Sequence, residues 1–122
     1  MSDHNSMFKT FYIFLMIALF SFSSCGNKED KELAEWVEKG ALVVDVRTPK
    51  EYEKRHFPGA VNIPIDSLPL RVDELGPKDK QIILYCQSGG RSSRAKSLLL
   101  DDGFTNIKDA GGIENLFSAT SK

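Results

Sequence analysis

Residues 81–103 have the sequence QIILYCQSGGRSSRAKSLLLDDG, and this stretch decides the fold. Its first six residues form a short apolar run that is typical of a buried strand. A serine and two glycines then predict a tight turn, and the remaining residues predict a helix that ends at Gly103. A buried strand followed at once by a helix is the unit from which α/β domains are built.

The same alternation continues on both sides of this stretch. We expect further strands at residues 41–46 and 105–110, a brief strand or extended edge at 60–65, and further helices at 30–40, 48–56, 66–76 and 111–117. Thr48 and Glu51 have the spacing of a capping box at the start of the second of these helices. The pattern predicts an α/β three-layer sandwich, in which helices cover both faces of a central, mostly parallel sheet.

Composition limits the classes of protein that fit. The chain has 122 residues, of which 41% are hydrophobic and 27% are charged, as is typical of one soluble domain. Its 16 basic residues nearly balance 17 acidic ones and are scattered, so we expect no nucleic-acid partner.

The N-terminal residues differ in character from the rest. The apolar run from Phe11 to Phe20 is shorter than the roughly 20 residues that a membrane-spanning helix needs. A single Lys9 precedes the run and small residues follow it, which is typical of a secretory signal. We therefore expect export of the chain.

Cys25 follows this run after two serines, and the arrangement resembles the cleavage box of bacterial lipoproteins. The resemblance implies that Cys25 becomes the lipidated first residue of the mature chain. Phe22 departs from the pattern, since an aliphatic residue is usual there. We expect a lipoprotein-type signal peptide at residues 1–24, a short tether at 25–30 and the folded domain at 31–120. Plain secretion or an uncleaved anchor remains the alternative.

Cys86 ends the strand of the opening stretch, at the edge of the sheet where open α/β sheets bind ligands. Gly89 and Gly90 let the turn bend so that backbone amides point at the thiol. Arg91 and the helix N-terminus add positive charge. These groups favour the thiolate, so we expect a pKa below the usual value of about 8.5. The alternative is that Cys86 is only a small buried apolar residue.

Two motifs together resemble the rhodanese family of single-domain sulfurtransferases: VVDVRTPKEYEKRHFPGAVNIP at 43–64 and LYCQSGGRSSRA at 84–95. The resemblance extends over about residues 30–118. It implies that Cys86 accepts sulfane sulfur from thiosulfate as a persulfide and passes it to cyanide or a thiol. It also implies a cradle for the persulfide and the anionic donor, made by Gln87, Ser88, Gly89, Gly90 and Arg91. Leu116 departs from the family, which often has Trp there.

The first motif favours structural roles. Asp45 and Arg47 lie two residues apart on one strand and can form an ion pair beside the loop. His56 is expected to be a polar residue satisfied by the backbone at a helix end, since transfer from a preformed thiolate needs no base. No cluster of metal ligands is evident around it, and we expect neither a metal nor a cofactor.

Two other functions are alternatives to sulfur transfer by an enzyme. A cysteine phosphatase would need five residues between the cysteine and the arginine, whereas four separate Cys86 from Arg91. A sulfur carrier or protein-binding module would keep the same loop without turning over small molecules. We expect a monomer that uses a small sulfur donor and a thiol or cyanide acceptor. A lipid anchor would hold it on the periplasmic or extracellular side of a bacterial envelope.

Overall fold

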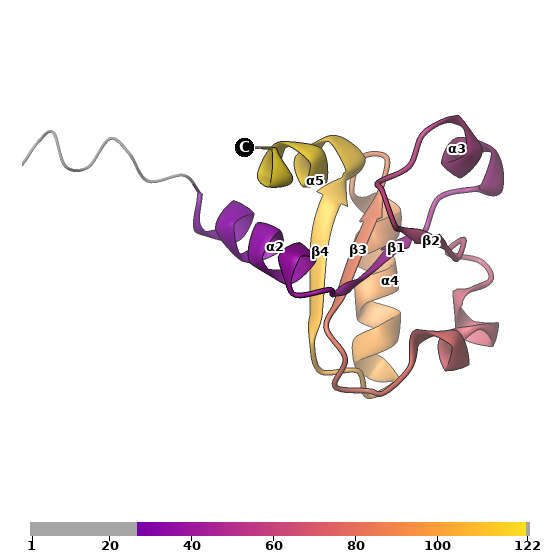
Figure 1. Cartoon of the computed structure of the whole chain (residues 1–122). Helices are drawn as coiled ribbons and strands as arrows, with labels where there is room; N and C mark the ends of the chain where they lie inside the picture. Colours follow the sequence, from indigo (N-terminus) through magenta and orange to yellow (C-terminus); the bar gives the residue numbers. More distant parts are fainter. Residues whose placement is uncertain (1–26, 122) are drawn as a thin grey trace, which may run out of the picture.

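The computed structural model describes residues 27–121, so the expected signal peptide and Cys25 lie outside the described part of the chain. Figure 1 shows its elements in chain order. They are α2 (Lys28–Glu38), β1 (Leu42–Asp45), α3 (Pro49–Lys54), β2 (Val61–Asn62), the 3-10 turns η1 (Leu68–Leu70) and η2 (Val72–Leu75), β3 (Ile82–Cys86), α4 (Gly90–Asp101), β4 (Ile107–Gly112) and α5 (Ile113–Thr120).

The four strands form one parallel sheet in the order β2-β1-β3-β4. Residues 42–45 of β1 pair in register with residues 82–85 of β3, so the two apolar strands of the sequence lie side by side. The carboxyl ends of β1 and β3 therefore meet at one edge, as Figure 1 shows. The predicted α/β fold class is confirmed.

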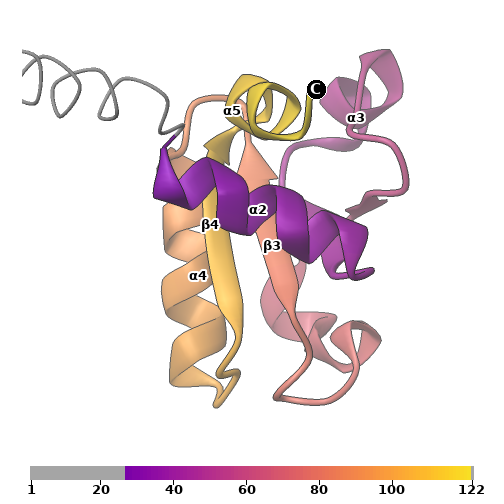
Figure 2. The same cartoon turned by 60° about the vertical axis from the view of Figure 1, so that its left-hand side comes forward.

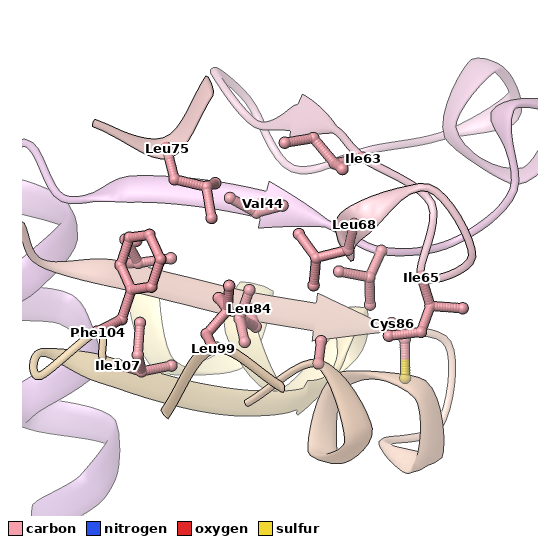
Figure 3. Close-up of a cluster of buried hydrophobic side chains, with 13 residues drawn as sticks. Val44, Ile63, Ile65, Leu68, Leu75, Leu84, Cys86, Leu99, Phe104 and Ile107 are labelled. Carbon is pink, nitrogen blue, oxygen red and sulfur yellow. The ribbon is translucent and has the colours of Figure 1, made fainter. Parts of the chain in front are cut away.

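Helices cover both faces of this sheet because successive strand side chains point to opposite sides. In β3, Ile83 and Tyr85 pack with α2 and α5, whereas Leu84 and Cys86 belong to the apolar cluster under α4. Figure 2 shows α2 crossing in front of the strands, with α4 beside β4. Figure 3 shows the α4 side, where Leu84 lies close to Leu99. The predicted three layers are present.

Side-chain caps determine where α2 and α3 begin. Thr48 and Glu51 form the predicted capping box at the start of α3. Helix α2 begins at Lys28, two residues earlier than expected, because the Asn27 side chain accepts a hydrogen bond from the Glu29 amide at 3.4 Å. The helix thus includes residues 28–30, half of the expected tether at 25–30.

One expectation for the middle of the chain needs correction. Residues 66–76 were expected to form a helix, but they form the two 3-10 turns η1 and η2. Pro69 has no amide to donate, neither turn has a side-chain cap, and Arg71 leaves helical geometry with φ −122°. Strand β2 has only two residues, although the amides of Ile63 and Ile65 continue the pairing by donating to β1 and the residue after it.

In residues 27–121 no helix combines the length and the apolar character that crossing a membrane requires.

Candidate active site

Cys86 is the last residue of β3, and helix α4 begins only four residues later at Gly90. The connecting turn is possible because Gly89 adopts φ 108°, in the left-handed region that favours glycine. Its amide donates a hydrogen bond to Cys86 Sγ at 2.9 Å. The turn therefore directs backbone N–H groups at the sulfur, as expected. Figure 3 shows the sulfur pointing to the α4 side of the sheet.

The environment of the thiol favours its charged form. Cys86 is only 1% exposed, and burial alone would raise its pKa. The Ser92 hydroxyl and the amides of Ser92, Gly89 and Ser88 outweigh this effect and lower the pKa of Cys86. Ser92 Oγ lies 3.6 Å from Sγ and is buried in the first turn of α4. A thiolate can thus exist in a site that is almost closed to water.

A buried ion pair supports the turn from the β1 side. Arg47 Nη2 lies 2.7 Å from Asp45 Oδ2, and the two side chains are 4% and 0% exposed. The hydrogen bond to Asp45 raises the pKa of Arg47 although burial opposes it. The same guanidinium donates to Gln87 Oε1 at 3.2 Å and to the Arg55 carbonyl at 2.6 Å. The ion pair predicted beside the loop is present, and it ties the loop to the end of α3.

Arg91 is held by a carboxylate of α3. Its guanidinium donates two parallel hydrogen bonds to Glu51, at 2.8 and 2.9 Å. These bonds lower the pKa of Glu51 from 4.5 to about 2; burial opposes the shift and hydrogen bonds from Thr48 add to it. The positive charge of Arg91 is therefore already paired, and its expected contact with the donor stays a prediction.

A cleft of about 210 Å³ opens beside the turn. It is lined by Arg47, Glu51, Lys54, Arg55, Gln87 and Ile113. Three of these six residues are cationic, and Gln87 directly follows the cysteine. A larger hollow of about 520 Å³ between α2, β4 and α5 includes no residue of the turn. The cationic side chains that line the smaller cleft suit the binding of a small anion.

Comparison with known families decides the family. The profile of the rhodanese-like domain matches residues 29–119. The chain belongs to the rhodanese family. Among the similar proteins, thiosulfate sulfurtransferase PspE of Escherichia coli (strain K12) is 35% identical over 74 residues, which cover 60% of this rhodanese and 71% of that protein.

Solved structures and larger proteins also resemble this rhodanese. A structure described as a rhodanese with anions from E. coli superposes with a TM-score of 0.60 and 32% identity, covering 62% of this chain and 91% of that one. The tRNA uridine(34) hydroxylase of Hamiltonella defensa is 40% identical over 89 residues, but these are 67% of this chain and only 25% of the hydroxylase. Similar domains thus occur both alone and within longer chains.

The structure also places the other residues that were singled out in the sequence of this rhodanese. His56 Nδ1 lies 2.8 Å from the Tyr52 carbonyl at the end of α3, and the two rings stack at 3.8 Å. The structural role expected for His56 is therefore confirmed. Gln87 and Ser88 are exposed at the turn. Residues 27–121 contain no group of three or more metal-binding side chains.

Several residues that shape the site were not predicted from the sequence. Gly112 is one, since a Cβ there would lie 2.7 Å from the Gln87 carbonyl oxygen, so the end of β4 supports the turn only as glycine. The Gly-Gly pair after the last predicted strand was the available signal. Lys54 and Arg55 gave a signal as adjacent cations at a helix end. Ser92 gave none, because a serine in a first helical turn is common.

Proposed function

We propose that this rhodanese is a sulfurtransferase that moves sulfane sulfur from thiosulfate or a similar donor through a persulfide on Cys86. The observation that carries the proposal is the almost fully buried Cys86 sulfur, which receives a hydrogen bond from the Gly89 amide and has a lowered pKa. The names of the relatives support it: the E. coli protein is a thiosulfate sulfurtransferase, and the E. coli rhodanese structure has anions.

The proposed reaction has two displacement steps. The Cys86 thiolate attacks the outer sulfur of thiosulfate, and the sulfur–sulfur bond of the donor breaks as sulfite leaves with its electron pair. The terminal sulfur of the resulting persulfide carries the negative charge, which the amides of the turn stabilise. Cyanide or a thiolate then attacks that terminal sulfur, and the bond between the terminal sulfur and Cys86 breaks. The products are thiocyanate or a new persulfide, together with the restored Cys86 thiolate. No base and no metal is required.

Intact mass measurement tests the nucleophile. We expect the protein to gain the mass of one sulfur atom on incubation with thiosulfate and to lose it when cyanide is added. Cys86→Ser should abolish both the gain and the production of thiocyanate, because no other thiol lies in the loop. Cys25→Ser is the matched control and should load sulfur normally. Loading of the Cys86→Ser protein would refute the proposal.

The second candidate function is that of a sulfur carrier. In a carrier, Cys86 would also accept one sulfur atom from thiosulfate. The two functions differ in turnover: an enzyme produces thiocyanate catalytically from thiosulfate and cyanide, whereas a carrier releases its sulfur only to a protein partner. Loading of sulfur from thiosulfate without production of thiocyanate in excess cyanide would favour the carrier.

A further inference from the structure

The cations in and next to the cleft at Gln87 are paired, with one exception. Arg47 forms a buried ion pair with Asp45, and Arg91 forms two hydrogen bonds to Glu51. Arg55 forms an ion pair with Glu114 and lies 4.4 Å from the centre of the Phe117 ring. Each of these three positive charges is thus balanced by a carboxylate.

Lys54 is the exception. It is the last residue of α3, is exposed, and lines the cleft together with Gln87. No hydrogen bond or ion pair engages its ammonium group within residues 27–121. The cleft therefore has one uncompensated positive charge, which shares its lining with Gln87, the residue that follows Cys86.

We propose that Lys54 binds the anionic end of the sulfur donor and makes the site selective for small donors with two negative charges. This inference rests on the proposed sulfurtransferase function. The donor's outer sulfur meets Cys86 while its sulfonate oxygens lie in the cleft, next to the ammonium group and the Gln87 side chain. Arg47 acts as a positioning residue, because its buried guanidinium group is already occupied by the Asp45 carboxylate.

The size and charge of the cleft support a small donor. A volume of about 210 Å³ is below the roughly 300 Å³ at which sites for drug-sized ligands begin. Lysine provides a compact charge on a flexible stem, which can follow a small anion without requiring a fixed fork geometry. Thiosulfate carries two charges and a substituted thiosulfonate only one, so Lys54 should favour thiosulfate.

Steady-state kinetics on charge variants tests the proposal. We expect Lys54→Gln to lower kcat/KM for thiosulfate about fivefold, the effect of one charge contact near a protein surface, and Lys54→Glu to lower it further. With dithiothreitol as an uncharged acceptor, kcat/KM for the acceptor should not change. The decrease in kcat/KM caused by each Lys54 variant should be smaller for a monoanionic alkyl thiosulfonate than for thiosulfate.

The matched control is Lys50→Glu, since Lys50 is exposed on the same helix but does not line the cleft. The control has the same change in net charge as Lys54→Glu and should retain most of the thiosulfate activity. The assignment of Lys54 would be overturned if Lys50→Glu lowered kcat/KM as much as Lys54→Glu. It would also be overturned if Lys54→Glu lowered kcat/KM equally for thiosulfate and the alkyl thiosulfonate.

Equilibrium binding separates this inference from the proposed function. Thiosulfate titrated into Cys86→Ser protein should bind several-fold more tightly than into the Cys86→Ser, Lys54→Glu double variant. This difference would support the anion site even if the wild type failed to turn over, in which case only the proposed enzymatic function would be refuted. Binding that is the same in both proteins would overturn the Lys54 site.

Discussion

At the scale of single residues, Ser92 links the sulfur to the backbone that surrounds it. Its Oγ lies 3.6 Å from Cys86 Sγ and 3.1 Å from the Gly89 carbonyl oxygen. The hydroxyl has one proton, so it can donate to that carbonyl while the sulfur is protonated and turn to the sulfur when it is a thiolate. Ser92 is completely buried, so water does not replace it in this role.

Ser92→Ala should therefore raise the pKa of Cys86. Because the hydroxyl favours the charged form, its loss should move the pH midpoint of Cys86 alkylation by iodoacetamide to higher pH. Peptide mass analysis measures the reaction at Cys86 separately from Cys25. Ser92→Thr keeps the hydroxyl and should restore a midpoint near that of the wild type. An unchanged midpoint in Ser92→Ala would show that the backbone amides suffice.

The position of Cys86 could be predicted from the sequence, whereas part of its surroundings could not. An apolar strand, a Gly-rich turn and a helix fix the cysteine at a strand end by local rules alone. The pairing of Arg91 with Glu51 joins residues 40 positions apart, and the position of Lys54 beside Gln87 depends on how α3 ends. Such contacts arise only once the sheet is assembled.

At the scale of elements, α3 is attached to the site at both of its ends. Glu51 in its first turn binds Arg91 at the start of α4, and the Arg55 carbonyl after its last turn accepts a hydrogen bond from Arg47. Helix α3 has only six residues and no fully buried side chain, so its own packing holds it weakly. These contacts position the helix that carries Lys54.

Glu51→Gln should lower stability in a pH-dependent way. The shift of its pKa from 4.5 to about 2 corresponds to at most about 3 kcal/mol, and exposure of about a third of both side chains reduces the expected effect to about 1 kcal/mol. A lowered folded-state pKa stabilises the protein above pH 4.5, and this contribution disappears as the pH falls toward 2.

Urea unfolding of wild type and Glu51→Gln at about pH 6 and about pH 2 measures this contribution. The difference in the free energy of unfolding should be present at the higher pH and nearly absent at the lower one. Glu53→Gln, an exposed position on the same helix, is the control and should have little effect at either pH. A constant difference for Glu51→Gln would indicate lost packing in place of lost charge.

At the scale of the whole molecule, we propose that the chain is exported and held at a membrane by lipid on Cys25. The apolar run from Phe11 to Phe20 and the small residues before the cysteine support this proposal. Only two residues separate Cys25 from the start of α2, a distance of at most about 10 Å at roughly 3.3 Å per residue. The rhodanese domain would then lie against the lipid headgroups.

Fatty acid labelling in a bacterial host tests the anchor. The wild type should incorporate label and fractionate with membranes, while Cys25→Ser should remain unlabelled. Thiosulfate sulfurtransfer should be retained in Cys25→Ser, because Cys86 lies in a separate part of the chain. Labelling of both proteins to the same extent, or of neither, would rule out lipid on Cys25 and leave plain secretion or an uncleaved helix as the interpretation.

The two outer strands of the sheet affect how the protein behaves when it is crowded. Strand β2 pairs over only two residues and is followed closely by Pro64, which has no N–H to offer another chain. Strand β4 carries Lys108 and an irregular register opposite Leu84 and Tyr85. Short length, proline, lysine and bulges each discourage the addition of a foreign strand. Both edges of the sheet therefore resist amyloid-like aggregation, so neighbouring copies at high concentration do not fuse their sheets.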